Sequence, residues 1–305
     1  MEYLLPEHFV RSPDALARTW THTEAERYTR WLANSHYENF HVVSFLLPKK
    51  LHQDFYNVYS FCRWADDLGD EIGDTAESLR LLGWWRTELD RMYSGEAQHP
   101  VFVALMGTVR KYDLPIEPFS DLIHAFVHDQ TVTRYTTWND VLHYCKYSAN
   151  PVGRLLLYLC GYRDAERQRL SDATCTGLQL ANFWQDVSVD LKKDRVYIPQ
   201  EAMTRHGYTD RELFSGVEDA RFQAVMRDAV SRARELFMEG LPLARTVDKR
   251  LSVDLELFSR GGLLILDKIE RQQYLVLHNR PAIGKLERVR LLVATLARAA
   301  FTRAA

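Results

Sequence analysis

Four polar side chains follow one face of a predicted helix in the stretch GLQLANFWQDVSVD, which begins at Gly177. Steps of three, four and four residues separate them, and this spacing keeps side chains on one face of an α-helix. The residues between them are largely apolar, so hydrophobic surface borders the face. An oxygen-rich line in such surroundings indicates binding or catalysis rather than a solvated surface. The four side chains are Gln179, Asn182, Asp186 and Asp190.

A second pair of aspartates stands far upstream, in the stretch FYNVYSFCRWADDLGDEIGD. Asp66 and Asp70 are four residues apart and share a helix face. Two such pairs would repel each other and be costly to bury together unless cations neutralised them. Carboxylate and amide oxygens suit a hard cation, and Mg²⁺ is usually held by a few carboxylates together with water and substrate phosphates. The two pairs therefore predict Mg²⁺-dependent binding of a phosphorylated substrate.

Cationic side chains accompany both aspartate pairs. Arg63 stands one turn before Asp66, and the stretch KKDRVYIP places Lys193, Arg195 and Tyr197 directly after Asp190. Guanidinium and ammonium groups bind phosphate oxygens through charge-assisted hydrogen bonds. Aromatic rings in an apolar pocket can stabilise positive charge through their faces. Together these residue types predict metal-assisted ionisation of a lipid diphosphate.

Helical periodicity runs through nearly the whole chain, and strand-like alternation is nearly absent. The breaks between helical segments are short, and no segment has the composition of a flexible linker. The sequence therefore predicts a single all-α domain over residues 1–305. The predicted helices cover residues 50–71, 75–93, 115–129, 138–160 with a break at the NP of 150–151, 166–191, 211–239 and 250–277.

Composition narrows the classes of protein that fit. The 305 residues carry a formal net charge of -2, which argues against a nucleic-acid partner because phosphate-backbone binding normally requires a basic excess. No secretory signal or run of about 18 apolar residues is present. The four cysteines form no Cys-x-x-Cys pair, which favours reduced thiols. We therefore expect a soluble cytoplasmic protein.

Three stretches together resemble the squalene/phytoene synthase family of trans-isoprenyl synthases: ADDLGDE, YCKYSANPVGRLLLYLCG and QLANFWQDVSVDLKKDRVYIP. The stretches YENFHVVSFLLPKKL and LQLANFWQD are most similar to the hydroxysqualene synthase branch of hopanoid synthesis. The resemblance implies an all-helical isoprenoid synthase bundle around a central cavity. In such a bundle, Asp66, Asp70, Asp186 and Asp190 would lie on opposite walls and bind Mg²⁺ and diphosphate.

The resemblance also assigns roles by position. It implies that Asn182 joins the metal ligands, that Gln179 and Asn182 support diphosphate, and that Tyr144 lies near the reacting carbons. Further diphosphate-contacting positions correspond to His36, Arg63, Arg195, Tyr197 and Arg280. The positions that would line the hydrocarbon channel are Phe40, Ala149, Val152, Gly153, Leu156 and Phe183.

Two departures from the family pattern point to the substrate. Condensing relatives usually carry two serines where HYENF has Tyr37 and Asn39, and they commonly carry Arg where this chain has Gln185. Both changes weaken the capture of two diphosphates at once, so a substrate with a single diphosphate fits better. The resemblance then implies ionisation of presqualene diphosphate and capture by water, giving hydroxysqualene without a reductant. No Gly-x-Gly-x-x-Gly fingerprint for a dinucleotide follows a strand.

Several alternatives stay open at this point. Squalene, dehydrosqualene or phytoene synthases condense two allylic diphosphates, and a non-catalytic isoprenoid carrier would use the same helices without turnover. His124 and His128 have a spacing that suits zinc but no evident third ligand, and two Glu-x-x-His stretches raise a di-iron bundle. Because a prenyl diphosphate and its product are greasy, we also expect peripheral contact with the inner membrane and with neighbouring hopanoid-pathway enzymes.

Overall fold

The computed structural model describes residues 3–35 and 48–301, and its elements are α-helices joined by turns and short 3-10 segments. Within these residues, extended backbone pairs at one isolated bridge, between Arg134 and Val196. The predicted all-α class is therefore confirmed. The chain divides into two compact units, the first comprising Met1–Thr131 and Arg154–Arg163 and the second Val132–Gly153 and Asp164–Ala305. One domain over residues 1–305 stays a prediction.

The first unit is built around α5, the helix that carries the upstream aspartates. Its apolar residues recur every three or four positions, and Phe61, Ala65 and Leu68 are fully buried, whereas Asp66 and Asp70 point from the opposite face. The helices of this unit are α1 (Pro6–Phe9), α2 (Pro13–Ala17), α3 (His22–Ser35), η1 (Lys49–Leu51), α5 (His52–Asp70), α6 (Thr75–Tyr93), α7 (Pro100–Tyr112) and α8 (Glu117–His128).

Aromatic packing fixes the middle of α5 against its neighbours. Trp64 stacks on Trp85 of α6 with ring centroids 5.0 Å apart and an interplanar angle of 7°. His99 lies edge-on to both rings, and burial lowers its pKa well below the usual range, so the imidazole is neutral. This cluster holds the helix turn that leads directly into Asp66.

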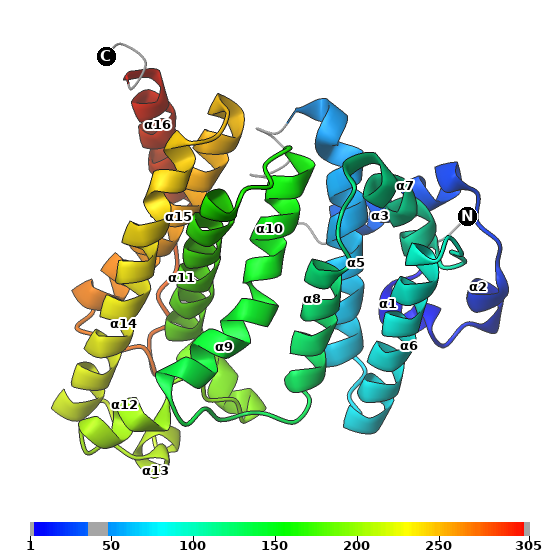
Figure 1. Ribbon diagram of the computed structural model, residues 1–305. Helices are drawn as coiled ribbons and strands as arrows, with labels where there is room; N and C mark the ends of the chain where they lie inside the picture. Colours follow the sequence, from blue (N-terminus) through cyan, green and yellow to red (C-terminus); the bar gives the residue numbers. More distant parts are fainter. Residues whose placement is uncertain (1–2, 36–47, 302–305) are drawn as a thin grey trace. The chain divides into compact units, whose positions relative to one another are not determined.

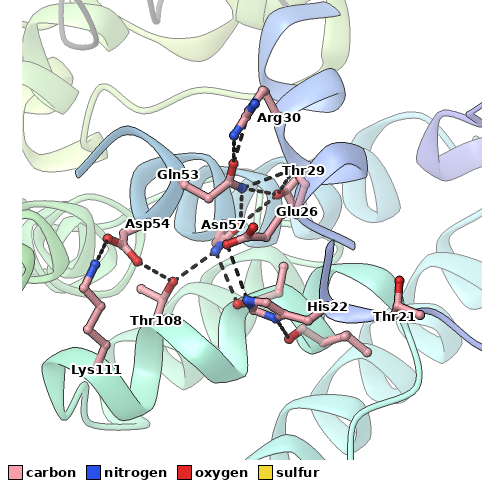
Figure 2. A network of polar contacts seen from close by, with 12 residues as sticks. Thr21, His22, Glu26, Thr29, Arg30, Gln53, Asp54, Asn57, Thr108 and Lys111 are labelled. Atoms are coloured by element: carbon pink, nitrogen blue, oxygen red, sulfur yellow. Dashed lines mark hydrogen bonds and ion pairs between the residues drawn. The ribbon is translucent and has the colours of Figure 1, made fainter. Parts of the chain in front are cut away.

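A buried polar network fixes the first half of α5 against α3 and α7 (Figure 2). The amide of Asn57 donates to the hydroxyl of Thr108 at 3.0 Å and accepts from the hydroxyl of Thr29 at 2.7 Å. Thr108 in turn donates to Asp54, whose other oxygen is bound by Lys111 at 2.7 Å. Each of these bonds depends on the rotation of α5 about its axis, so the network determines which way Asp66 and Asp70 face.

The second unit contains three long helices, α11 (Ala165–Asp190), α14 (Ala220–Gly240) and α15 (Lys249–Arg271), which lie side by side (Figure 1). Glycines allow their close approach. A Cβ on Gly262 of α15 would lie 2.1 Å from the ring of Phe237 of α14, and one on Gly177 of α11 would lie 3.3 Å from the same ring. The ring of Phe237 is thus held between Gly177 of α11 and Gly262 of α15. The remaining elements are α9 (Trp138–Ser148), η2 (Leu191–Lys193), α12 (Gln200–Arg205), α13 (Asp210–Phe214), η3 (Leu241–Arg245) and α16 (Lys285–Phe301).

Helix α10 (Asn150–Leu159) begins in the second unit and continues into the first after Gly153. The break predicted at 150–151 is confirmed, because α9 ends at Ser148. One predicted helix is wrong: residues 211–239 do not form a continuous helix. Gly216 adopts a left-handed φ of 71°, and Asp219 caps a new helix that begins at Ala220. The helices at 22–35, 100–112 and 285–301 are additional to those predicted. In the described part of the chain, no helix is long and apolar enough to span a bilayer.

Candidate active site

Asp186 and Asp190 lie one turn apart on α11, and both are partly buried. Burial and the negative charge of Asp186 raise the pKa of Asp190 to about 7, although the positive charges of Arg195, Lys193 and Arg280 oppose the shift. Burial therefore makes full ionisation of the pair costly. A divalent cation would offset that cost, so this carboxylate pair fits Mg²⁺.

Arg280 reaches Asp186 from a loop 94 residues later in the sequence and forms an ion pair with it. Gln185 holds the same loop, because its amide donates to the carbonyl oxygen of Pro281 at 2.7 Å. The neutral residue at position 185 thus fastens the segment that brings in a guanidinium. The sequence placed Arg280 at the diphosphate by resemblance alone, and the structure places it beside the second aspartate pair.

The segment after α11 is held in a defined conformation. Asp194 adopts a left-handed φ of 56° and forms an ion pair with Arg134, while the backbone NH of Val196 donates to the carbonyl oxygen of Thr133. The backbone NH of Arg195 donates to the carbonyl oxygen of Asp190 at 3.0 Å. These contacts keep Arg195 and the residues after it close to the end of α11.

Four aromatic rings gather beside this segment. Tyr197 stacks on Phe183, with ring centroids 3.7 Å apart and an interplanar angle of 5°. The ring centroid of Tyr144 lies 6.0 Å from that of Tyr197 and 6.2 Å from that of Phe183. Tyr135 joins them, 5.7 Å from both Tyr144 and Tyr197. Sequence reasoning missed Tyr135, which stands in a short link between helices where no periodicity signals burial. The cluster can present ring faces to a positive charge.

A small cavity of about 10 Å³ adjoins the cluster and is lined in part by Asp190, Arg195 and Tyr197. This volume suits about one water molecule. The cavity is therefore far too small for a hydrocarbon chain.

The upstream pair occupies the last turns of α5 in the first unit. Arg63 binds Asp66 at 3.1 Å and also forms an ion pair with Asp67. Burial raises the pKa of Asp67 to about 7, against the opposing charge of Arg63. Asp66 is partly exposed and Asp70 is exposed, so both carboxylates are accessible to a ligand. The diphosphate role of Arg63 stays a prediction.

For the other predicted site residues within 3–35 and 48–301, the structure gives the element and the degree of burial. Gln179 is partly buried and Asn182 is exposed on α11. Ala149 and Gly153 are buried, Val152 is exposed, and Leu156 is partly buried in the portion of α10 that belongs to the first unit. The roles of all these residues stay predictions. His36 and Phe40 lie outside the described residues.

Each unit therefore offers a pair of carboxylates. In residues 3–35 and 48–301, no group of three or more His, Cys, Asp or Glu side chains is arranged to hold a metal ion by itself. Mg²⁺ commonly takes one or two carboxylates and completes its shell with water and substrate phosphate. The two pairs fit that mode of binding, and the requirement for Mg²⁺ is a proposal.

Replacing Gln185 by alanine is expected to release the loop at Pro281 and lower the catalytic efficiency toward a prenyl diphosphate by about tenfold, the loss of roughly one hydrogen bond. Because Gln185 acts through Arg280, the added effect of R280A is expected to be smaller in the Q185A background than in the wild type. Steady-state kinetics of the two single variants and the double variant test this coupling. Fully additive losses would show that Gln185 does not position Arg280.

Comparisons with known proteins identify the family of this chain. The family model for squalene/phytoene synthase matches residues 33–287. The chain is 34% identical to the hydroxysqualene synthase of Rhodopseudomonas palustris, over 71% of this chain and 74% of that protein. It is 30% identical to the 15-cis-phytoene synthase of Synechococcus elongatus, over 85% of this chain and 88% of that protein.

Among solved structures, a squalene synthase designated HpnC from Alicyclobacillus acidocaldarius is 42% identical and superposes with a TM-score of 0.80, over 88% of this chain and 99% of that one. The two aspartate motifs, the all-α fold and the span of these matches lead to one conclusion. This chain belongs to the squalene/phytoene synthase family, whose members are isoprenoid synthases that act on prenyl diphosphates.

Proposed function

We propose that this chain converts presqualene diphosphate and water into hydroxysqualene and diphosphate. The observation that carries the proposal is Gln185, an uncharged side chain whose amide is engaged by the carbonyl oxygen of Pro281. By the family resemblance, relatives that condense two diphosphates commonly have Arg at this position. With one cation fewer, the site suits a substrate that carries one diphosphate. The identity to a hydroxysqualene synthase also supports this choice.

The chemistry balances without a reductant. The bond between the cyclopropylcarbinyl carbon and the diphosphate oxygen breaks, and its electron pair leaves with diphosphate. The cation rearranges, a water oxygen forms the new carbon–oxygen bond, and the water releases one proton to solvent. One water molecule is consumed and one diphosphate is released for each hydroxysqualene formed.

Different residues contribute to different parts of this reaction. Asp66, Asp70, Asn182, Asp186 and Asp190 would hold Mg²⁺, which when bound stabilises the negative charge on the departing diphosphate. The guanidinium groups of Arg63, Arg195 and Arg280 bind diphosphate oxygens. The ring faces of Tyr144, Phe183 and Tyr197 stabilise the cation while their bulk limits the access of water. This proposal requires both aspartate pairs, so substitutions at either pair are expected to stop the reaction.

The test is incubation with Mg²⁺ and either presqualene diphosphate or farnesyl diphosphate, each with and without NADPH, followed by extraction and mass analysis. Hydroxysqualene from presqualene diphosphate alone, independent of NADPH, is the expected product. Squalene or phytoene formed from an allylic diphosphate would overturn the proposal.

Squalene synthesis is the second candidate, favoured by the 42% identity to the squalene synthase of Alicyclobacillus acidocaldarius. It predicts squalene instead of hydroxysqualene, and its formation would require an added reductant. The NADPH arm of the same experiment therefore separates the two candidates. For either product we propose a cytoplasmic enzyme in contact with the inner membrane and with neighbouring hopanoid-pathway enzymes, which would take up a hydrocarbon product.

A further inference from the structure

Helix α16 has one face against α15 (Figure 1). Thr295 is fully buried on this inner face, and Glu287, two turns earlier, is bound by Lys268 of α15 at 2.6 Å. Residues at this spacing share one side of a helix. The inner face therefore accounts for the attachment of α16 to its unit.

The opposite face of α16 exposes a stripe of large apolar side chains. Leu286 is 76% exposed, Val289 58%, Val293 60% and Leu296 44%. Steps of three, four and three residues place them in one row along the helix. Other exposed large apolar residues of the described chain, such as Met238 and Phe214, belong to different helices. A contiguous apolar row of this kind indicates a surface that binds a partner.

The charge beside the stripe identifies the kind of partner. The basic residues of α16 are Lys285, Arg288, Arg290 and Arg298, and its single acidic residue, Glu287, is already bound by Lys268. Arg271 of α15 adds a further positive charge close to Glu287. Two copies of so basic a helix would repel each other, whereas an anionic bilayer attracts both the cations and the apolar row.

We propose that α16 lies flat on an anionic membrane surface, with Leu286, Val289, Val293 and Leu296 at the boundary between headgroups and acyl chains. Lys285, Arg288 and Arg290, which stand beside the first residues of the row, would contact lipid phosphates. The purpose of this membrane binding rests on the proposed function, because a hydrocarbon product has to leave the enzyme for an apolar phase. The binding itself needs no turnover.

The experiment measures binding of the full chain to vesicles of phosphatidylcholine alone and of equal parts phosphatidylcholine and phosphatidylglycerol. Binding to the anionic vesicles, weakened by added salt, is the expected result for the wild type. V289E/V293E is expected to bind at least about tenfold more weakly. R288Q/R290Q is expected to lose about fivefold for each charge removed. M238E, at a side chain that is 60% exposed on α14, is the matched control and is expected to bind like the wild type.

Three results would overturn the proposal. The first is that V289E/V293E binds vesicles as tightly as the wild type, and the second is that the wild type shows no preference for anionic vesicles. The third is that the wild type does not bind vesicles but self-associates in ultracentrifugation, and that V289E/V293E abolishes this self-association. Product formation in detergent separates this inference from the proposed function. V289E/V293E is expected to keep its detergent turnover, and a wild type that binds vesicles but yields no hydroxysqualene would remove the proposed function alone.

Discussion

Replacing Asp186 by asparagine is expected to lower product formation by at least about three orders of magnitude. The substitution keeps the shape of the side chain but removes one of two carboxylates available to Mg²⁺ in the second unit. It also takes away the partner that Arg280 binds in the structure. Asp66→Asn in the first unit is expected to have an effect of similar size, because the proposed reaction needs both pairs. The measurement is diphosphate release with saturating Mg²⁺.

Matched controls on ordinary surface carboxylates make this test specific. Glu166→Gln introduces the same change from carboxylate to amide on α11, where Glu166 is exposed and binds Arg169. Asp90→Asn introduces it on α6, where Asp90 is exposed and binds Arg86. Both controls are expected to retain turnover within about twofold. If Asp186→Asn turned over substrate like Asp90→Asn, the aspartate pair would be a solvated helix face. A protein that binds the prenyl diphosphate in wild-type and variant forms but never releases diphosphate would be a carrier.

Replacing Asp254 by asparagine is expected to stabilise the protein at alkaline pH. Asp254 lies near the start of α15 and is only 2% exposed, and neither of its carboxylate oxygens has a hydrogen-bond partner among the described residues. Burial, with a smaller contribution from the charge of Asp248, raises the pKa of Asp254 to about 8. A buried carboxyl without partners is destabilising once it ionises.

The direction of the pH dependence follows from proton binding. Between the unfolded-state pKa of about 3.9 and the folded-state pKa of about 8, the folded protein holds a proton that the unfolded chain has lost. The contribution of Asp254 to the free energy of unfolding is therefore full below about pH 4 and falls as the pH rises toward about 8. Asp254→Asn does not titrate. The difference in unfolding free energy, variant minus wild type, is expected to grow by on the order of 2–4 kcal/mol between pH 5 and 8.

Denaturant unfolding at several pH values checks this expectation. Asp267→Asn is the control, because Asp267 lies on the same helix but is partly exposed and binds Arg234 at 2.9 Å. A variant-minus-wild-type difference that stayed constant with pH would show that Asp254 ionises normally, with a partner for its charge. The cost of burying the asparagine amide does not depend on pH. It therefore cancels when the variant-minus-wild-type difference at one pH is compared with that at another.

Helix positions were largely predictable because the signal is local. The segments 75–93 and 166–191 match α6 and α11 within one residue, since apolar side chains recur with the helical period throughout them. The prediction of one continuous helix over 211–239 was wrong, because the apolar periodicity continues across Gly216, where a left-handed φ ends the helix. Helix α16 was missed although its sequence is periodic. A basic segment with an apolar row facing solvent does not follow the usual pattern of a core helix.

The sequence by itself determined two alignments of carboxylates: Asp66 with Asp70 on one helix face, and Asp186 with Asp190 on another. Spacing along a helix is a local property, so those alignments needed no tertiary information. The tertiary structure alone decided that Arg280 pairs with Asp186 and that Tyr135 joins Tyr144 and Tyr197. It also decided that Asp254 is buried with no hydrogen-bond partner among the described residues. These outcomes depend on how residues distant in sequence pack together, and no helical period encodes that packing.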